Sequence, residues 1–228
     1  MDAAVDRRRL VVHVVTVAED VEHERAMLAD TLEAVGPHAS AGCGDWTAFD
    51  LAAHIVAADR AAGTLAFCIR MLAARGVQFN PKPQVIAAAI SRERRDGYPA
   101  LLARLRQRSP RLLLAPPVAA STLFEVWMHH DDLTTSNGLA HGIPDHLALA
   151  IPPLVRYQAK HLPSRLIIRT RGHEWTFGPD IGGPSAVVLS GPAADLIRWL
   201  SGRGPLTALD VEATPAVVEE LQAFVGTI

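Results

Sequence analysis

Two side chains that bind metals well lie one helical turn apart in the middle of the sequence. Glu125 and His129 are four positions apart and Asp132 follows three later, so all three share one face of an α-helix. Side chains at this spacing have Cβ atoms about 5–6 Å apart, which lets a carboxylate and an imidazole hold one ion. The spacing permits a metal site, although many helices carry such a pair without a metal.

His54 is the candidate for a third ligand. It belongs to a predicted apolar helix stripe that contains Leu51, Ile55 and Ala58. In a helical bundle, facing helices project side chains into a shared core, so a second helix can complete a site. Two histidines and one carboxylate leave positions open for water or substrate, as in catalytic metal sites.

Each of these residues also has a purely structural interpretation. His54 can be a core histidine that is hydrogen-bonded to a neighbouring helix. Glu125 follows Thr122 by three positions, which is the spacing of a capping box. His129 lies beside the polar residues 130–132 and can be a surface histidine. Spacing alone leaves these alternatives open.

Other polar residues are expected to have no role in the site. Cys43 and Cys68 are too few for a disulfide framework and match no zinc-ribbon or redox motif. No basic residue flanks either cysteine closely, so both are interpreted as structural. The acidic and histidine residues 22–24 are interpreted as a solvated face, and His130 as pointing away from the site.

Apolar spacing and helix caps predict an all-helical first part. Capping boxes are expected at Thr16 with Glu19 and at Thr47 with Asp50. The predicted helices span residues 16–35, 47 to about 72, 85–108 with an interruption at 97–99, and about 122–135. They form a helical bundle.

After Pro144 the pattern changes. Residues 165–171 and 174–177 alternate around Gly172 and predict a hairpin. Further strands are expected at residues 186–189 and 206–211. Helices are expected at about 145–161, with a kink at 152–153, at 193–200, ending at Gly202, and after Thr214. The fold class is therefore α+β, with a four-helix bundle in residues 1–143 and a small α+β domain in 144–228.

Composition restricts the classes of partner. The 228 residues carry 22 Lys+Arg and 24 Asp+Glu, a net charge of −2, so a nucleic-acid partner is not expected. No apolar run reaches the ~20 residues of a membrane helix. The basic and apolar start matches a signal peptide poorly, because His13 interrupts it. We expect a cytoplasmic protein, monomeric or homodimeric, with no membrane partner.

Three segments together resemble the mycothiol-dependent maleylpyruvate isomerase family, which belongs to the DinB-like bundle superfamily. Residues 45–54, DWTAFDLAAH, look like its tryptophan-to-histidine signature. Residues 125–133, EVWMHHDDL, resemble its Glu-x-x-x-His signature. Residues 189–203 are similar to its C-terminal sterol-carrier-like domain. The likeness keeps the order of the parts over most of the chain.

The resemblance implies a metal centre and a thiol cosubstrate. His54, Glu125 and His129 would bind a divalent metal, with zinc expected. Mycothiol would be the low-molecular-weight thiol, and its thiolate would add to a double bond or displace a leaving group of a small electrophilic substrate. Asp132 is expected to support the site, because ligating histidines usually donate their other nitrogen to an acceptor. An isomerase and an S-transferase are both compatible with these parts.

Arg203 is the candidate catalytic residue outside the metal ligands. In a family with acidic substrates or thiols, its planar guanidinium could clamp an anion. The alternative is a surface arginine that interacts with a helix dipole.

Two other function classes remain open. A metal-assisted hydrolase would use the same ligands and a bound water. A non-catalytic protein would hold a small apolar ligand in the C-terminal domain. The electrophile, the metal and the oligomeric state are not determined by the sequence.

Overall fold

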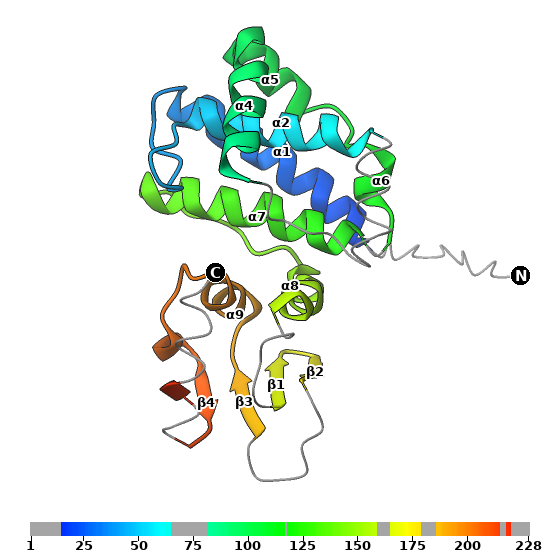
Figure 1. Cartoon of the computed structure of the whole chain (residues 1–228), viewed down its shortest axis with the longest axis vertical. Coiled ribbons are helices and arrows are strands. Elements are labelled where there is room, and N and C mark those ends of the chain that lie inside the picture. Colours follow the sequence, from blue (N-terminus) through cyan, green and yellow to red (C-terminus); the bar gives the residue numbers. More distant parts are fainter. Residues whose placement is uncertain are drawn as a thin grey trace, which may run out of the picture.

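The computed structural model describes residues 15–64, 82–116, 118–158, 165–178, 186–214 and 218–219. A helical bundle is followed by a small sheet with helices on one side (Figure 1). The predicted α+β class is therefore confirmed. The bundle contains α1 (Val17–Val35), α2 (Ala48–Ala62), α4 (Pro83–Glu93), α5 (Tyr98–Leu105), α6 (Arg111–Leu114) and α7 (Val118–Ser136).

Both predicted capping boxes are present at the starts of α1 and α2. The Thr16 and Thr47 hydroxyls accept from the amides of Glu19 and Asp50, and those carboxylates accept from the threonine amides. α2 ends at Ala62, and the continuation expected to residue 72 lies outside the described residues. Cys68 also lies outside them.

α7 begins four residues earlier than the sequence pattern indicated. Thr122 is therefore inside the helix, where its hydroxyl donates to the carbonyls of Val118 (3.2 Å) and Leu113 (2.9 Å). The capping-box interpretation of Glu125 is wrong for this reason, and its carboxylate is free to take part in the site.

The second part of the chain forms a four-stranded sheet of order β2-β1-β3-β4. β1 (Arg165–Thr170) and β2 (His173–Phe177) make the predicted hairpin, and β3 (Ala186–Ser190) lies parallel to β1. The expected fourth strand is shorter than predicted, because Leu206–Ala208 form a 3-10 turn and only Asp210–Glu212 make β4. α8 (Ile151–Gln158) and α9 (Ala193–Leu200) lie between the sheet and α7 (Figure 1).

The helix expected at residues 145–161 is divided in two. A 3-10 helix, Leu147–Ala150, precedes α8. Pro152 and Pro153 fall in the first turn of α8, where a missing amide donor breaks no helical hydrogen bond. The helix expected after Thr214 lies outside the described residues, apart from Val218 and Glu219, which are helical.

Two hydrophobic cores share α7. One lies within the bundle and includes Leu51, Ile55 and Leu133. The other runs from α1 and α7 through α8 and α9 to the sheet, and includes Trp127 and Leu196. Because this core crosses residue 143, the helix that carries the candidate ligands is packed against both parts of the chain. The division at residues 143 and 144 remains a prediction.

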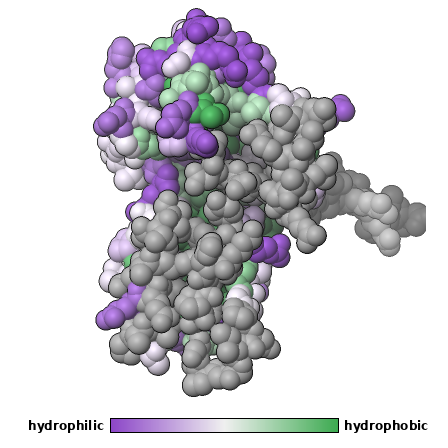
Figure 2. Space-filling model, viewed as in Figure 1, coloured by the Kyte–Doolittle hydropathy of each residue, from purple (hydrophilic) through white to green (hydrophobic). Residues whose placement is uncertain are grey.

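The described surface at the α4 and α5 end of the bundle is mostly hydrophilic around a small apolar area (Figure 2). Among the described residues, no helix combines the length and apolar character needed to cross a membrane.

Candidate metal centre

The structure brings the three predicted metal ligands together. His54 comes from α2, and Glu125 and His129 come from α7. Glu125 Oε1 lies 3.1 Å from His54 Nε2 and 3.3 Å from His129 Nε2. One ligand atom from each residue lies within 4.8 Å of the other two. The three side chains converge as the facing helices of a bundle allow.

These distances fit a bound divalent ion. Zinc binds imidazole nitrogen and carboxylate oxygen at about 2.0–2.2 Å, so two ligands of a tetrahedral ion lie about 3.3 Å apart. The two separations in the structure, 3.1 and 3.3 Å, are close to this value. Without an ion, the 3.1 Å contact between His54 and Glu125 is a hydrogen bond. Two imidazoles and one carboxylate suit zinc and its neighbours.

The electrostatics of the site favour a positive charge. Burial opposes ionisation of Glu125, but hydrogen bonds with His129 and His54 hold its pKa well below the usual range. Burial also works to lower the pKa of His129, but hydrogen bonds with Cys43 and Glu125 outweigh it and raise the pKa to about 10. A proton on His129 thus occupies a place that a cation would take, since a ligating imidazole nitrogen must be deprotonated.

The loop between α1 and α2 adds Cys43 and Trp46 to the site. The Cys43 sulfur lies 3.4 Å from His129 Nδ1. The Trp46 ring lies 5.0 Å from the ring of His54 and 6.3 Å from that of His129, measured between centroids. The expectation that Cys43 has no basic neighbour is wrong, because His129 reaches it from α7, a distant part of the sequence.

Gly42 sets the position of this loop against α7. Its φ is +76°, and a Cβ at this position would lie 2.3 Å from the Asp132 carbonyl oxygen. The loop is also held by Ser136 and Asn137, whose side chains donate to the Ser40 carbonyl at 3.0 and 2.9 Å. The close backbone approach requires glycine.

We expect Gly42→Ala to lower the free energy of unfolding by about 3 kcal/mol, from left-handed backbone strain and overpacking together. Gly44→Ala is the matched control, because Gly44 also has a positive φ, +53°, but no atom within 4 Å of the added Cβ. That variant should lose only about 1 kcal/mol. Urea unfolding of both measures the difference, and equal losses would contradict the close approach.

Arg203 lies beside the centre and contacts Asp132. Its Nε is 2.8 and 2.9 Å from the two carboxylate oxygens, and Nη1 donates to the Ser201 carbonyl at 3.2 Å. A Schellman turn at the end of α9 places it, because Gly202, at φ +73°, and Arg203 donate backbone hydrogen bonds to Trp199 and Arg198. Arg203 is an exposed residue near a helix end whose guanidinium also contacts Asp132 on α7.

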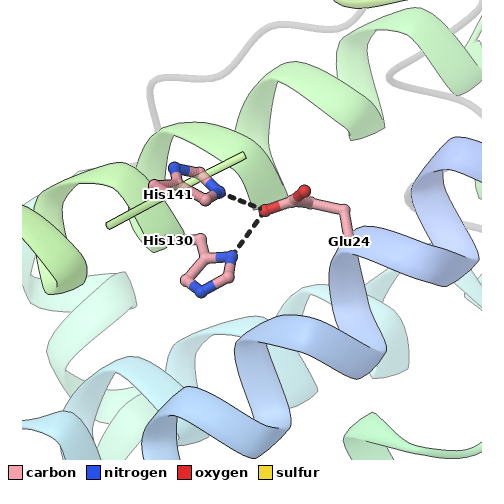
Figure 3. Close-up of side chains that lie close together, drawn as sticks. All are labelled: Glu24, His130 and His141. Carbon is pink, nitrogen blue, oxygen red and sulfur yellow. Dashed lines mark hydrogen bonds and ion pairs between the residues drawn. The ribbon is translucent and has the colours of Figure 1, made fainter. Parts of the chain in front are cut away.

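A second cluster of metal-binding residue types lies on another face of α7. His130 Nδ1 and His141 Nε2 both point at one oxygen of Glu24, at 2.6 and 2.7 Å (Figure 3). Glu24 and His130 are buried and His141 is partly buried. His130 thus points away from the candidate metal centre, as expected, whereas the interpretation of Glu24 as part of a solvated face is wrong. Glu24 shares a helix stripe with Val21 and Leu28, a signal that could have predicted its burial. His141 follows α7 in a loop and carried no such signal.

This cluster is a closed hydrogen-bond network. His130 Nε2 lies 2.8 Å from the Thr31 hydroxyl, and His141 Nδ1 lies 3.3 Å from Asp131. The distances to Glu24 are those of charge-assisted hydrogen bonds and are shorter than the ~3.3 Å between ligands of a tetrahedral ion. All four imidazole nitrogens have partners among the described residues, and we interpret the cluster as a hydrogen-bond network.

The network predicts a loss of stability at alkaline pH. Burial alone would lower the pKa of His141, but hydrogen bonds with Asp131 and Glu24 raise it from 6.5 to about 9. A pKa raised on folding stabilises the protein fully below pH 6.5, and this contribution disappears as pH rises through about 9. The full shift corresponds to about 3 kcal/mol, and we expect a fall of about 2 kcal/mol because solvent screens this partly buried group. Urea unfolding should show a larger fall in the wild type than in His141→Gln, which keeps only the contribution from the raised pKa of His129. An equal fall in both would contradict the role of His141.

A known protein family matches the part of the chain that contains the candidate metal centre. The sequence model described as Mycothiol maleylpyruvate isomerase N-terminal domain matches residues 21–134, which include His54, Glu125 and His129. A crystal structure of the mycothiol-dependent maleylpyruvate isomerase is similar at 15% identity, covering 86% of this chain and 90% of that chain, with a TM-score of 0.47. The structure of a histidine-to-alanine mutant of that enzyme is 14% identical, with 86% of this chain and 91% of that chain covered and a TM-score of 0.46. These values are too low to transfer residue roles. No curated protein matches significantly.

Proposed function

The chain belongs to the mycothiol maleylpyruvate isomerase family, and on this premise we propose a metal- and mycothiol-dependent isomerase or S-transferase that acts on a small electrophile. The observation that carries the proposal is the convergence of His54, Glu125 and His129 from two helices. All three lie inside the matched region. Their spacing and charge suit a divalent ion, for which zinc is the first candidate.

The residues of the chain would hold and shape the centre. His54, Glu125 and His129 supply three ligands and leave further positions open. A divalent ion there would lower the pKa of a thiol or water, so that a nucleophilic anion exists near neutral pH. The Trp46 ring, 5.0 and 6.3 Å from the two imidazole rings between centroids, would form one wall of the centre.

Arg203 is proposed as the residue that binds an anionic group of the substrate or thiol. Asp132 and Ser201 occupy its Nε and Nη1, and Nη2 makes no hydrogen bond to the described residues. Asp132 thus orients the guanidinium while one donor group stays available. Arginine binds carboxylates through such directed donors, which lysine cannot reproduce.

We expect Arg203→Lys to raise KM for an acidic substrate at least about tenfold, which corresponds to ~1.4 kcal/mol of binding. The variant should retain stoichiometric metal, because Arg203 is not a ligand. Arg169→Lys is the matched control, since Arg169 forms an exposed ion pair with Glu174 on the sheet. Steady-state kinetics with saturating thiol measure the effect. An unchanged KM in Arg203→Lys would remove the residue from substrate binding.

The direct test is turnover with and without mycothiol. Metal-loaded protein is incubated with maleylpyruvate and with a panel of small electrophiles, and products are followed by absorbance and chromatography. The proposal expects isomerisation or a thiol conjugate only when mycothiol is present, and none in His54→Ala. Thiol-independent hydrolysis would support the metal-assisted hydrolase instead. Metal binding without turnover would favour a small-ligand binding role.

A further inference from the structure

The Cys43 sulfur lies between a candidate ligand and the carboxylate of Asp132. It is 3.4 Å from His129 Nδ1, 3.1 Å from Asp132 Oδ2 and 3.6 Å from the Ala41 carbonyl oxygen. The direct separation of His129 Nδ1 and Asp132 Oδ2 is 4.0 Å, which is too long for a hydrogen bond. The Cys43 sulfur therefore connects the His129 imidazole to the Asp132 carboxylate by hydrogen bonds.

Metal binding by His129 would set the direction of the hydrogen bonds that connect it to Cys43 and Asp132. Nε2 faces Glu125 and would carry the lone pair, so Nδ1 must hold the ring proton. Its nearest acceptor is the Cys43 sulfur. The thiol hydrogen then points to Asp132, whose two oxygens also accept from Arg203. The Ala41 carbonyl oxygen, at 3.6 Å, is the more distant acceptor for the thiol hydrogen, and the Arg203 Nε–H is shared between the two Asp132 oxygens.

We propose that Cys43 is a positioning residue, whose thiol fixes the tautomer and ring orientation of His129 and connects this ligand through Asp132 to Arg203. The proposal rests on the proposed function in that His129 is taken as a metal ligand. Ligating histidines almost always donate their second nitrogen to an acceptor, and loss of that acceptor weakens metal binding 10- to 100-fold. Here a cysteine fills the position usually held by a carboxylate or carbonyl.

Cys43 is placed to orient the site and not to bind the metal. One ligand atom each from Cys43, His129 and Asp132 lies within 4.8 Å of the others, so this group also has metal-ligand character. However, the sulfur lies on the Nδ1 side of the His129 ring, whereas Glu125 lies on the Nε2 side. His129 would therefore bind an ion held by His54 and Glu125 through its Nε2, and the sulfur would lie on the other side of the ring.

The test compares Cys43→Ala and Cys43→Ser with the wild type. Zinc affinity is measured by competition with a chromophoric chelator, and the cobalt-substituted proteins are examined by absorption spectroscopy. We expect Cys43→Ala to bind zinc 10- to 100-fold more weakly. A serine hydroxyl can accept from Nδ1 and donate to Asp132, so Cys43→Ser should restore affinity to within about threefold of the wild type. Circular dichroism of the metal-free proteins controls for folding.

Three outcomes would overturn the inference. Equal zinc affinity in the wild type and Cys43→Ala would overturn it alone and leave the proposed function standing. A thiolate-to-cobalt charge-transfer band in the wild type that is absent from Cys43→Ala would make Cys43 a ligand. A wild type that binds no metal would remove the proposed function and this inference together.

Discussion

His129→Ala and His54→Ala are each expected to abolish stoichiometric metal binding, whereas the wild type holds about one metal per chain. Two ligands remain in either variant, and one carboxylate with one imidazole cannot hold a divalent ion against dilution. Plasma mass spectrometry of tag-free protein measures the content. His173→Ala is the matched control, because His173 is exposed on β2 and distant from the centre in the fold.

Metal binding should also increase the free energy of unfolding. A ligand present at about 100 times its Kd stabilises the folded state by about 2.7 kcal/mol, and this gain should vanish in both variants and in chelated wild type. His141→Ala should keep its metal, because the second cluster is a hydrogen-bond network. About two metals per chain would contradict the interpretation of the second cluster as a hydrogen-bond network. The absence of metal from every zinc-treated sample would contradict the proposed metal centre.

Arg198→Met is expected to lower the free energy of unfolding by about 3 kcal/mol, the scale of a broken buried ion pair. Arg198 Nε and Nη2 donate to the two oxygens of Asp131 at 2.8 and 2.7 Å. The Asp131 side chain is only 7% exposed, so without the arginine its charge stays buried with His141 as its remaining partner. Urea unfolding at neutral pH measures the loss.

Two further variants separate this ion pair from general packing. Asp195→Ala removes the half-buried partner of Arg198 and should cost less than about 1 kcal/mol. The double variant Arg198→Met with Asp131→Asn removes the uncompensated charge and should recover part of the loss. If Arg198→Met costs no more than Asp195→Ala, Asp131 does not depend on this arginine.

The two arginines of the α9 region contact adjacent aspartates on α7. Arg198 binds Asp131 and Arg203 binds Asp132. Asp131 belongs to the closed network with His141, whereas Asp132 faces Cys43 and the candidate metal centre. The C-terminal part of the chain is thereby tied to both faces of the helix that carries Glu125. Changes in α9 are therefore expected to reach the centre through α7.

The sequence predicted most of the described elements, and helical spacing together with the family resemblance predicted the three candidate ligands. Helical periodicity and capping boxes depend on residues within one or two turns, so α1, α2 and the Glu125–His129 pair could be predicted locally. His54 was predictable because an apolar stripe must face the bundle core. Their roles as metal ligands remain predictions.

Only the tertiary structure decided what surrounds those ligands. Cys43 meets His129, Glu24 meets His141, and Arg198 meets Asp131 across separations of 86, 117 and 67 residues. No local pattern determines such pairs, because they follow from how a loop, α1 and α9 pack on α7. A buried polar group must find partners wherever packing brings them, so its neighbours are determined by the assembled fold.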